Sequence, residues 1–185
     1  MANWYKEQLT NKNFLSPIGF LFILDKAQKV SFLCQRAEIP DLQLGNVDIP
    51  TRGMVPIPVE GNLRYGDLNL EFIVDEDLTN YMELHNWIRA LGTPQELKER
   101  REWIDRFSKD TPSQDPRFSD ATIQVLNNNN QANFDIVFKS VFPTSLSTLN
   151  FDVTMGDNEF LTATATFQYT LYEIRKTNST ERKKK

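Results

Sequence analysis

The segment from Cys34 to Asp75 restricts the fold of this 185-residue chain more than any other stretch does. Strand-like sequence lies at both of its ends, and between them stand four prolines and four glycines: Pro40, Pro50, Pro56, Pro58, Gly45, Gly53, Gly61 and Gly66. A connection of this length in a small chain is uncommon unless it has a function or becomes ordered by a partner. We therefore predict that the segment acts outside the core of its own subunit.

The middle of this segment, residues 42–66, has the composition of a projecting β-hairpin and is called the arm below. Proline lacks an amide hydrogen, so prolines among β-forming residues favour edge or irregular strands over a central strand. We expect a hairpin that turns near Thr51–Gly53 and pairs with neighbouring copies of the chain. The residues assigned to this inter-subunit contact are Gly45, Val47, Ile49, Arg52, Gly53, Val55, Ile57, Val59 and Gly61. Such a contact is typical of an assembly subunit rather than of an enzyme.

Alternating or continuous apolar residues elsewhere predict five or six core strands. The expected strands are residues 19–25, 29–36, 68–75, 121–126, 134–141 and 160–172. The first two are separated by a short turn, so we expect them to form a hairpin with each other. The clearest alternation is in residues 160–172, where polar and apolar side chains change places at nearly every step.

A helix is predicted directly after the strand that ends at Asp75. Carboxylates at Asp75, Glu76 and Asp77 suit a helix start, because they accept bonds from free amides and complement the helix dipole. Gly92 stands where a glycine ends a helix. The residues at helical spacing, expected to cover one face of the sheet, are Leu78, Tyr81, Met82, His85, Ile88 and Leu91.

A second helix is predicted to run from Thr93 to about Phe107. Its first four residues, Thr93–Glu96, have the pattern of a capping box with proline at the first helical position. Few of its residues are apolar, so it should lie on the surface. Together with a proline-containing linker it forms a helical insertion over residues 93–118.

These elements predict a β-rich α+β fold, an antiparallel β-barrel or sandwich with one packed helix, one peripheral helix and the projecting arm. Residues 1–174 are expected to form a single domain, and residues 175–185 a basic flexible tail. The tail holds six basic residues and one acid, for +5, which leaves about −9 on the other 174 residues because the total is −4. The body is therefore acidic.

Catalytic chemistry is not indicated anywhere in the chain. Cys34 is the only cysteine and His85 the only histidine, which excludes an intramolecular disulfide and leaves no zinc set of usual spacing. We expect no catalytic, cofactor or metal site, and hence no enzyme. No apolar run is long enough for a membrane span, and the first residues lack a secretion signal, so we expect no membrane anchor and a reducing compartment.

Several elements follow one another in a distinctive order: the strand segment Ser31–Ala37, Ile39–Pro40, the long Gly/Pro hairpin, the strand Leu70–Val74, the acidic helix start Asp75–Asp77, Trp87 in the helix, and the closing strand 160–172. In this order, residues 14–174 resemble the tail tube proteins of contractile-tailed, T4-like bacteriophages. The helix around residues 94–107 and the basic tail depart from the family's pattern. For these two segments the resemblance does not predict the outer surface of the subunit or its position in a tail.

The resemblance implies a structural virion protein that is assembled in the host cytoplasm and resides in the viral tail. Such proteins form hexameric rings that stack into a hollow tube, with strands of six subunits closing into one inner barrel. The arm would reach adjacent subunits in the stack. The implied partners are other copies of the chain, the tail sheath, the baseplate and the tail terminator. Genomic DNA would pass through the lumen without specific binding.

The resemblance also implies a polar, water-filled lumen. We assign to the lumen face Asn69, Glu71, Thr162, Thr164 and Thr166. Further candidate lumen acids are Asp48, Glu60 and Asp75. An acidic wall would repel DNA phosphates, whereas many cationic contacts would retain the DNA.

Two alternatives stay open at the level of the sequence. The same fold serves baseplate and tube-end proteins, which start or terminate a tube and occur once per tail. A soluble β-sandwich binding module, or a hydrolase that uses His85 or a carboxylate pair, is the alternative from another class. Copy number in the particle separates the first alternative from a main tube protein, and the substitution His85→Ala tests the second.

Overall fold

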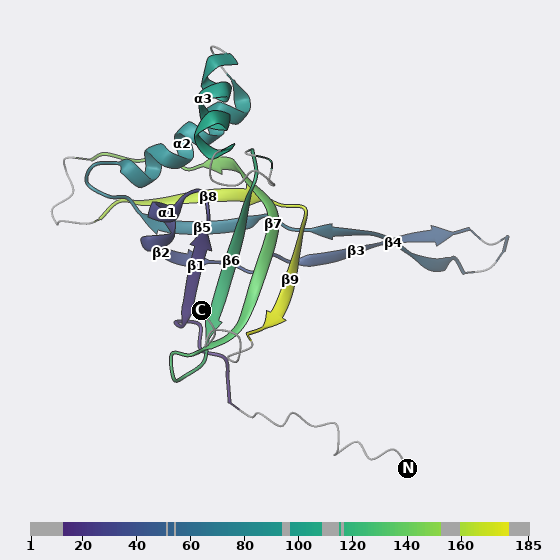
Figure 1. Ribbon diagram of the computed structural model, residues 1–185. Coiled ribbons are helices and arrows are strands. Elements are labelled where there is room, and N and C mark those ends of the chain that lie inside the picture. Colours follow the sequence, from purple (N-terminus) through teal and green to yellow (C-terminus); the bar gives the residue numbers. More distant parts are fainter. Residues whose placement is uncertain are drawn as a thin grey trace.

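The computed structural model describes residues 13–50, 52–53, 55–93, 97–108, 115, 117–152 and 160–177. Within them the chain forms a β-rich α+β fold with three helices, as the sequence predicts (Figure 1). The elements are β1 (Phe20–Leu24), α1 (Gln28–Phe32), β2 (Cys34–Ala37), β3 (Leu42–Ile49), β4 (Ile57–Tyr65), β5 (Leu68–Ile73), α2 (Thr79–Gly92), α3 (Leu97–Ser108), β6 (Ser119–Leu126), β7 (Ala132–Leu146), β8 (Thr162–Gln168) and β9 (Leu171–Lys176).

The main body is one antiparallel sheet of seven strands in the order β1-β6-β7-β8-β5-β2, with β9 also paired to β7. The 15-residue β7 joins two wings, because its first part pairs with β6 and β9 while its last part pairs with β8. Among the described residues, the edge strands β1 and β2 do not pair with each other. The sheet of one subunit is therefore open, and the predicted closure into a barrel is not seen.

The two wings bend around the hydrophobic core. The alternation of buried and outward-facing side chains is clearest in β5. Leu68, Leu70 and Phe72 are buried, while Asn69 and Glu71 point to the opposite face. The partners of the buried residues on β8 are also buried, namely Phe167, Ala165 and Ala163. Burying one large apolar side chain stabilises the fold by about 1.5–3 kcal/mol, so this alternation fixes which face of the sheet turns inward.

Helix α2 covers the core side of the sheet and begins at Thr79, a few residues after the predicted acidic start, with Leu78 in the left-handed conformation before it. Asp75 accepts hydrogen bonds from the backbone amides of Thr79 and Asn80, both at 2.9 Å. Burial raises the pKa of this carboxyl, but the hydrogen bonds from Asn80 and Thr79 outweigh it and hold the pKa below its ordinary value. The C-terminal end of α2 differs from the prediction by one residue: Gly92 is still helical, and Thr93 takes the left-handed conformation at φ 43°.

The buried face of α2 overlaps only in part with the predicted stripe, of which Tyr81 and Leu91 are partly buried against the core. Its buried residues are Asn80, Leu84, Trp87 and Ala90, whereas Met82, from the predicted stripe, is 44% exposed. The indole of Trp87 decides the rotation of the helix: it is fully buried, lies 6.4 Å from the Phe167 ring, and donates its N–H to the carbonyl of Arg117 at 3.1 Å. The predicted stripe left out this largest side chain.

Helix α3 lies on the outside of α2, in agreement with its predicted surface position (Figure 1). Its attachment is aromatic: Trp103 is buried and stacks on Trp87 with ring centroids 6.0 Å apart. Ion pairing adds a weaker contact, from Arg89 to Glu99 at 2.8 Å. The predicted capping box falls largely on residues 94–96, which lie outside the described residues.

Residues 29–36 do not form the predicted strand. Residues Gln28–Phe32 form the short helix α1, and only Cys34–Ala37 are extended. The predicted hairpin is also wrong, because β1 pairs with β6 and β2 pairs with β5. In a helix residues i and i+2 point to nearly opposite sides, so the two apolar residues of the predicted strand face are separated: Val30 is buried and Phe32 is exposed.

The predicted strand 160–172 is divided in two at Tyr169 and Thr170. Pairing with β7 nevertheless continues across the break, since Gln168 lies opposite Phe142 and Leu171 opposite Lys139. The last strand, β9, ends at Lys176, so the first basic residues of the predicted tail are part of the sheet. Residues 178–185 lie outside the described residues.

Candidate assembly surfaces

The arm has the predicted form, a two-stranded hairpin outside the main sheet. β3 and β4 pair from Leu42↔Tyr65 to Ile49↔Ile57, and Gly53 lies in the turn with a φ of 80°. At about 3.3 Å per residue the eight residues of β3 span roughly 26 Å. The hairpin leaves the body as a free-standing projection (Figure 1).

The apolar side chains of the arm lie opposite one another in cross-strand pairs on both sides of a β-bulge. In β3 the apolar residues stand at 42, 44, 47 and 49, which breaks the period of two once. The register shifts between Leu44 and Asn46, where two residues of β4, Gly61 and Asn62, lie opposite Gly45. The residues of these apolar pairs, together called the apolar arm face, are Leu42, Leu44, Val47, Ile49, Ile57, Val59, Leu63 and Tyr65.

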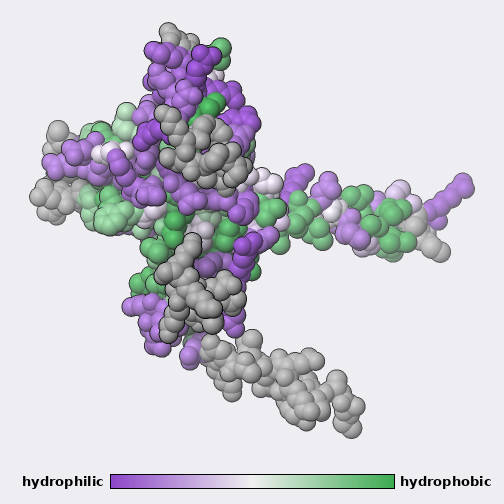
Figure 2. Space-filling view, in the orientation of Figure 1, coloured by the Kyte–Doolittle hydropathy of each residue, from purple (hydrophilic) through white to green (hydrophobic). Residues whose placement is uncertain are grey.

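The apolar arm face is exposed in the isolated subunit. Seven of its residues are between 37% and 62% exposed, and only Val59 is less so. Figure 2 shows apolar residues along the projecting hairpin. Other cross-strand pairs of the arm are polar, Gln43 with Arg64 and Asn46 with Glu60. Exposed apolar pairs of this number on a projecting hairpin are typical of a surface that binds another molecule.

The bulge brings two backbones into close contact. A Cβ placed on Gly61 would lie 3.0 Å from the carbonyl carbon and oxygen of Gly45. Gly61 therefore cannot be replaced by a larger residue without moving β3 away from β4. Of the residues predicted for the inter-subunit contact, Gly45 and Gly61 shape the arm, while Val47, Ile49, Ile57 and Val59 form its apolar face.

The root of the arm is held to the body by tyrosines. The ring of Tyr65 lies 5.9 Å from that of Tyr169 and 5.4 Å from that of Tyr172. Tyr169 donates its hydroxyl to the carbonyl of Gly66 at 2.9 Å, and burial raises its pKa above the ordinary value. These contacts fix the direction in which the arm leaves the sheet.

The second surface is the outer face of the wing β2-β5-β8, called the polar sheet face. Register places Asn69 opposite Thr166, Glu71 opposite Thr164, and Ile73 opposite Thr162. The hydroxyl of Thr166 lies 3.1 Å from the side-chain oxygen of Asn69, so it donates a hydrogen bond there. All five residues predicted for the lumen therefore lie on one face of one wing.

Other candidate lumen acids lie elsewhere, and two charged residues join the surface. Asp48 and Glu60 are on the arm, and Asp75 accepts hydrogen bonds from the first backbone amides of α2. Arg36 and Glu38 border the polar sheet face and form an ion pair of 2.8 Å. Sequence reasoning missed this pair because it did not pair β2 with β5.

Neither the cysteine nor the histidine has the surroundings of a reactive group. Burial raises the pKa of the Cys34 thiol to about 11, which keeps it protonated at neutral pH. His85 is half-buried on α2, and its Nδ1 atom has no hydrogen-bond partner among the described residues. Within the same residues no group of His, Cys, Asp and Glu side chains is placed to hold a metal ion. No described helix is long and apolar enough to cross a membrane.

Comparison with known proteins assigns the chain to a family. Residues 7–175 match the family model described as phage tail tube protein. The chain belongs to the phage tail tube protein family. Its members are structural proteins of the virion tail, not enzymes. No curated protein matches the sequence.

Solved structures share the fold of this tail tube protein at low sequence identity. The tube-terminating cap of the anti-feeding prophage is 17% identical with a TM-score of 0.60, covering 96% of this chain and 100% of the other. A chain of the sheath–tube complex of the PVC contractile injection system is 14% identical with a TM-score of 0.59, covering 90% of this chain and 94% of the other. A chain of the anti-feeding prophage baseplate is 16% identical with a TM-score of 0.60, covering 89% of this chain and 97% of the other.

Proposed function

We propose that this tail tube protein is the protomer of hexameric rings that stack into the tube of a contractile tail. The observation behind the proposal is the exposed apolar arm face on a rigidly rooted hairpin that projects from the body. An isolated subunit leaves this area in water, whereas a stack covers it with the next copy. Burying even four such side chains would contribute on the order of 5 kcal/mol per contact.

The polar sheet face is proposed to line the lumen. Its hydroxyl and amide groups bind water and offer a phosphate chain few cationic partners, and Arg36 is paired with Glu38. The opposite face of the same wing is the buried core, with α2 and α3 beyond it. This order places the helices on the outside of a ring, where a sheath would surround them. Genomic DNA passes through such a lumen without specific binding.

The open edges of the sheet fit the same arrangement. A lone subunit leaves β2 unpaired on one side, and an unpaired edge is a template for strand addition. Closure of a barrel is therefore proposed for the ring of subunits rather than for one chain. The proposed partners beyond the chain itself are the sheath, baseplate and terminator, in a tail assembled in the host cytoplasm.

Electron microscopy tests this proposal. Purified protein, or tails from particles, should show six-fold rings stacked around a pore. Deleting residues 45–61 should leave rings and a folded body, because the arm is outside the main sheet, while stacked tubes are lost. A wild-type chain that stays monomeric at high concentration and is missing from particles would exclude the proposed function.

A tube-terminating cap or baseplate subunit is the second candidate. The fold agrees as closely with an anti-feeding prophage cap and a baseplate chain as with a PVC sheath–tube chain, at TM-scores of 0.60, 0.60 and 0.59. Quantitative mass spectrometry of particles separates the two roles. A main tube protein is present in many rings, and a cap or initiator in a single ring.

A further inference from the structure

The wing β2-β5-β8 has two distinct ends, and the arm grows from one of them. β2 ends at Ala37 and is followed along the chain by β3, and β4 is followed by β5, which begins at Leu68. Both strands of the arm therefore join the wing at this end. At the opposite end the same strands begin or finish at Cys34, Ile73 and Thr162. Backbone bonds join this end across the sheet, from the Ile73 amide to the Leu33 carbonyl at 3.0 Å and from the Val74 amide to the Leu161 carbonyl at 2.8 Å. We call it the far end.

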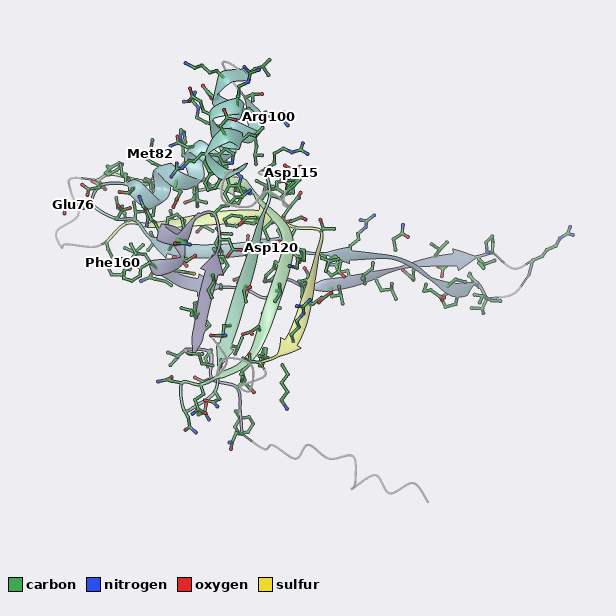
Figure 3. All side chains as sticks on the ribbon, viewed as in Figure 1. Glu76, Met82, Arg100, Asp115, Asp120 and Phe160 are labelled. Atoms are coloured by element: carbon green, nitrogen blue, oxygen red, sulfur yellow. The ribbon has the colours of Figure 1, made fainter. Side chains whose placement is uncertain are left out.

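The far end exposes large apolar side chains. Phe32 is 87% exposed and Phe160 is 64% exposed. Beside Phe32 lies an open groove of about 350 Å³, whose lining is Gln28, Lys29, Phe32, Leu33, Asp75, Thr79 and Asn80. Figure 3 places Phe160 and Glu76 at the end of the body that lies away from the arm. The molecule therefore has one unpartnered apolar surface on the arm and another at the opposite end.

The charge at the tip of the arm is opposite to the charges that follow β5 at the far end, where Lys29 also lines the groove. Arg52 is exposed between β3 and β4 and is the cation nearest the tip among the described residues of the arm. Glu76 and Asp77 are exposed at the far end, directly after the strand that the arm continues. A cation on one surface and two acids on the other favour one partner orientation.

We propose that the far end is the docking site for the arm of the next copy in the stack. This inference rests on the proposed function and names the receiving surface. Moving one copy along the direction of β2 and β5 brings its arm onto the far end of its neighbour, because arm and far end lie at opposite ends of the same strands. Such a head-to-tail contact joins two different patches and generates an open stack rather than a closed pair.

Paired substitutions test the site. Phe32→Asp places a charge at the docking surface and should abolish stacked tubes while single rings remain, by electron microscopy. Ile18→Asp is the matched control, since Ile18 is 88% exposed but lies before β1, away from the far end. Both variants should keep the wild-type unfolding midpoint. Normal tubes from Phe32→Asp would overturn the proposal.

Cross-linking locates the contact directly. In a Cys34→Ser background, Ile49→Cys combined with Phe32→Cys should give a ladder of covalently joined copies when tubes are treated with a short bis-maleimide. Ile49→Cys combined with Ile18→Cys should give none. Tubes in which only the second pair cross-links would place the arm elsewhere and overturn the inference, while leaving the proposed function intact. A wild-type chain that forms neither rings nor tubes would instead overturn both.

Discussion

At the scale of single residues, the structure depends on a few side chains with several bonds each. Trp87 packs on Phe167 and Trp103 and donates to the Arg117 carbonyl, so one indole joins the sheet, α3 and the segment before β6. Sequence periodicity found the helix but not this face, because a stripe chosen by spacing does not weigh the size of the side chains. Asp75 was predictable, since a carboxylate before a helical pattern has a local reason to be there.

Asp75→Ala should lower the free energy of unfolding by about 1 kcal/mol at pH 7, because two amide hydrogen bonds at the start of α2 are lost. Folding lowers the pKa of Asp75, so its stabilisation is present above the ordinary value of 3.8 and disappears as pH falls through the folded pKa. Urea unfolding between pH 3 and pH 7 measures this. The exposed neighbour, in Asp77→Ala, should show little change; a constant difference across the range would contradict the assignment.

At the scale of elements, strands and helices with long patterns were predictable, and their partners were less so. The arm, β5, β6 and both long helices are where the sequence predicts them. The pairing of β1 with β6 and of β2 with β5 was not, because strands far apart in sequence are brought together by the core and not by a turn. The bulge at Gly45 also has no reliable sequence signal beyond the single break in alternation.

Deleting Gly45 should abolish tube formation without unfolding the body. Gly45 is the β3 residue that lies opposite Gly61 and Asn62, so its loss shifts Leu42 and Leu44 by one residue relative to Val47 and Ile49 and reverses their side chains against the paired residues of β4. Electron microscopy reports the tubes, and the unfolding free energy of the body should change by less than about 0.5 kcal/mol.

Gly45→Ala is the matched control for that deletion. It keeps the length of β3, and the added Cβ would lie 3.4 Å from the nearest atom, the Asn62 carbonyl oxygen. This variant should still form tubes. Tubes from the deletion variant would show that the pairing register of the arm is not needed.

At the scale of the whole molecule, the family and the list of surfaces followed from sequence, while the open sheet did not. A barrel was predicted from the number and spacing of strands, but β1 and β2 do not pair with each other among the described residues, and closure by strands of other copies is part of the proposed function. The residues predicted for the lumen lie on one face of the wing, since alternation in β5 and β8 decides that face locally. Their position in a tube stays a prediction.

Thr164→Lys should convert the proposed lumen into a surface that retains DNA. Thr164 is exposed on the polar sheet face opposite Glu71, and a stack repeats each added cation in every subunit. Tubes of this variant should hold duplex DNA at low salt and release it as salt rises. Filter binding at two salt concentrations measures the effect, with Thr164→Glu as the control of opposite charge. Equal retention by both variants would exclude this face from the lumen.

The apolar side chains of the arm should also make the strength of the proposed stacking contact depend on temperature. Apolar association near room temperature is driven by the entropy of water and weakens on cooling. Rings joined through valine, leucine and isoleucine should therefore hold together more firmly at the host's growth temperature than in the cold. Because the proposed stacking contact is apolar, rings should be easiest to keep unstacked in a chilled preparation.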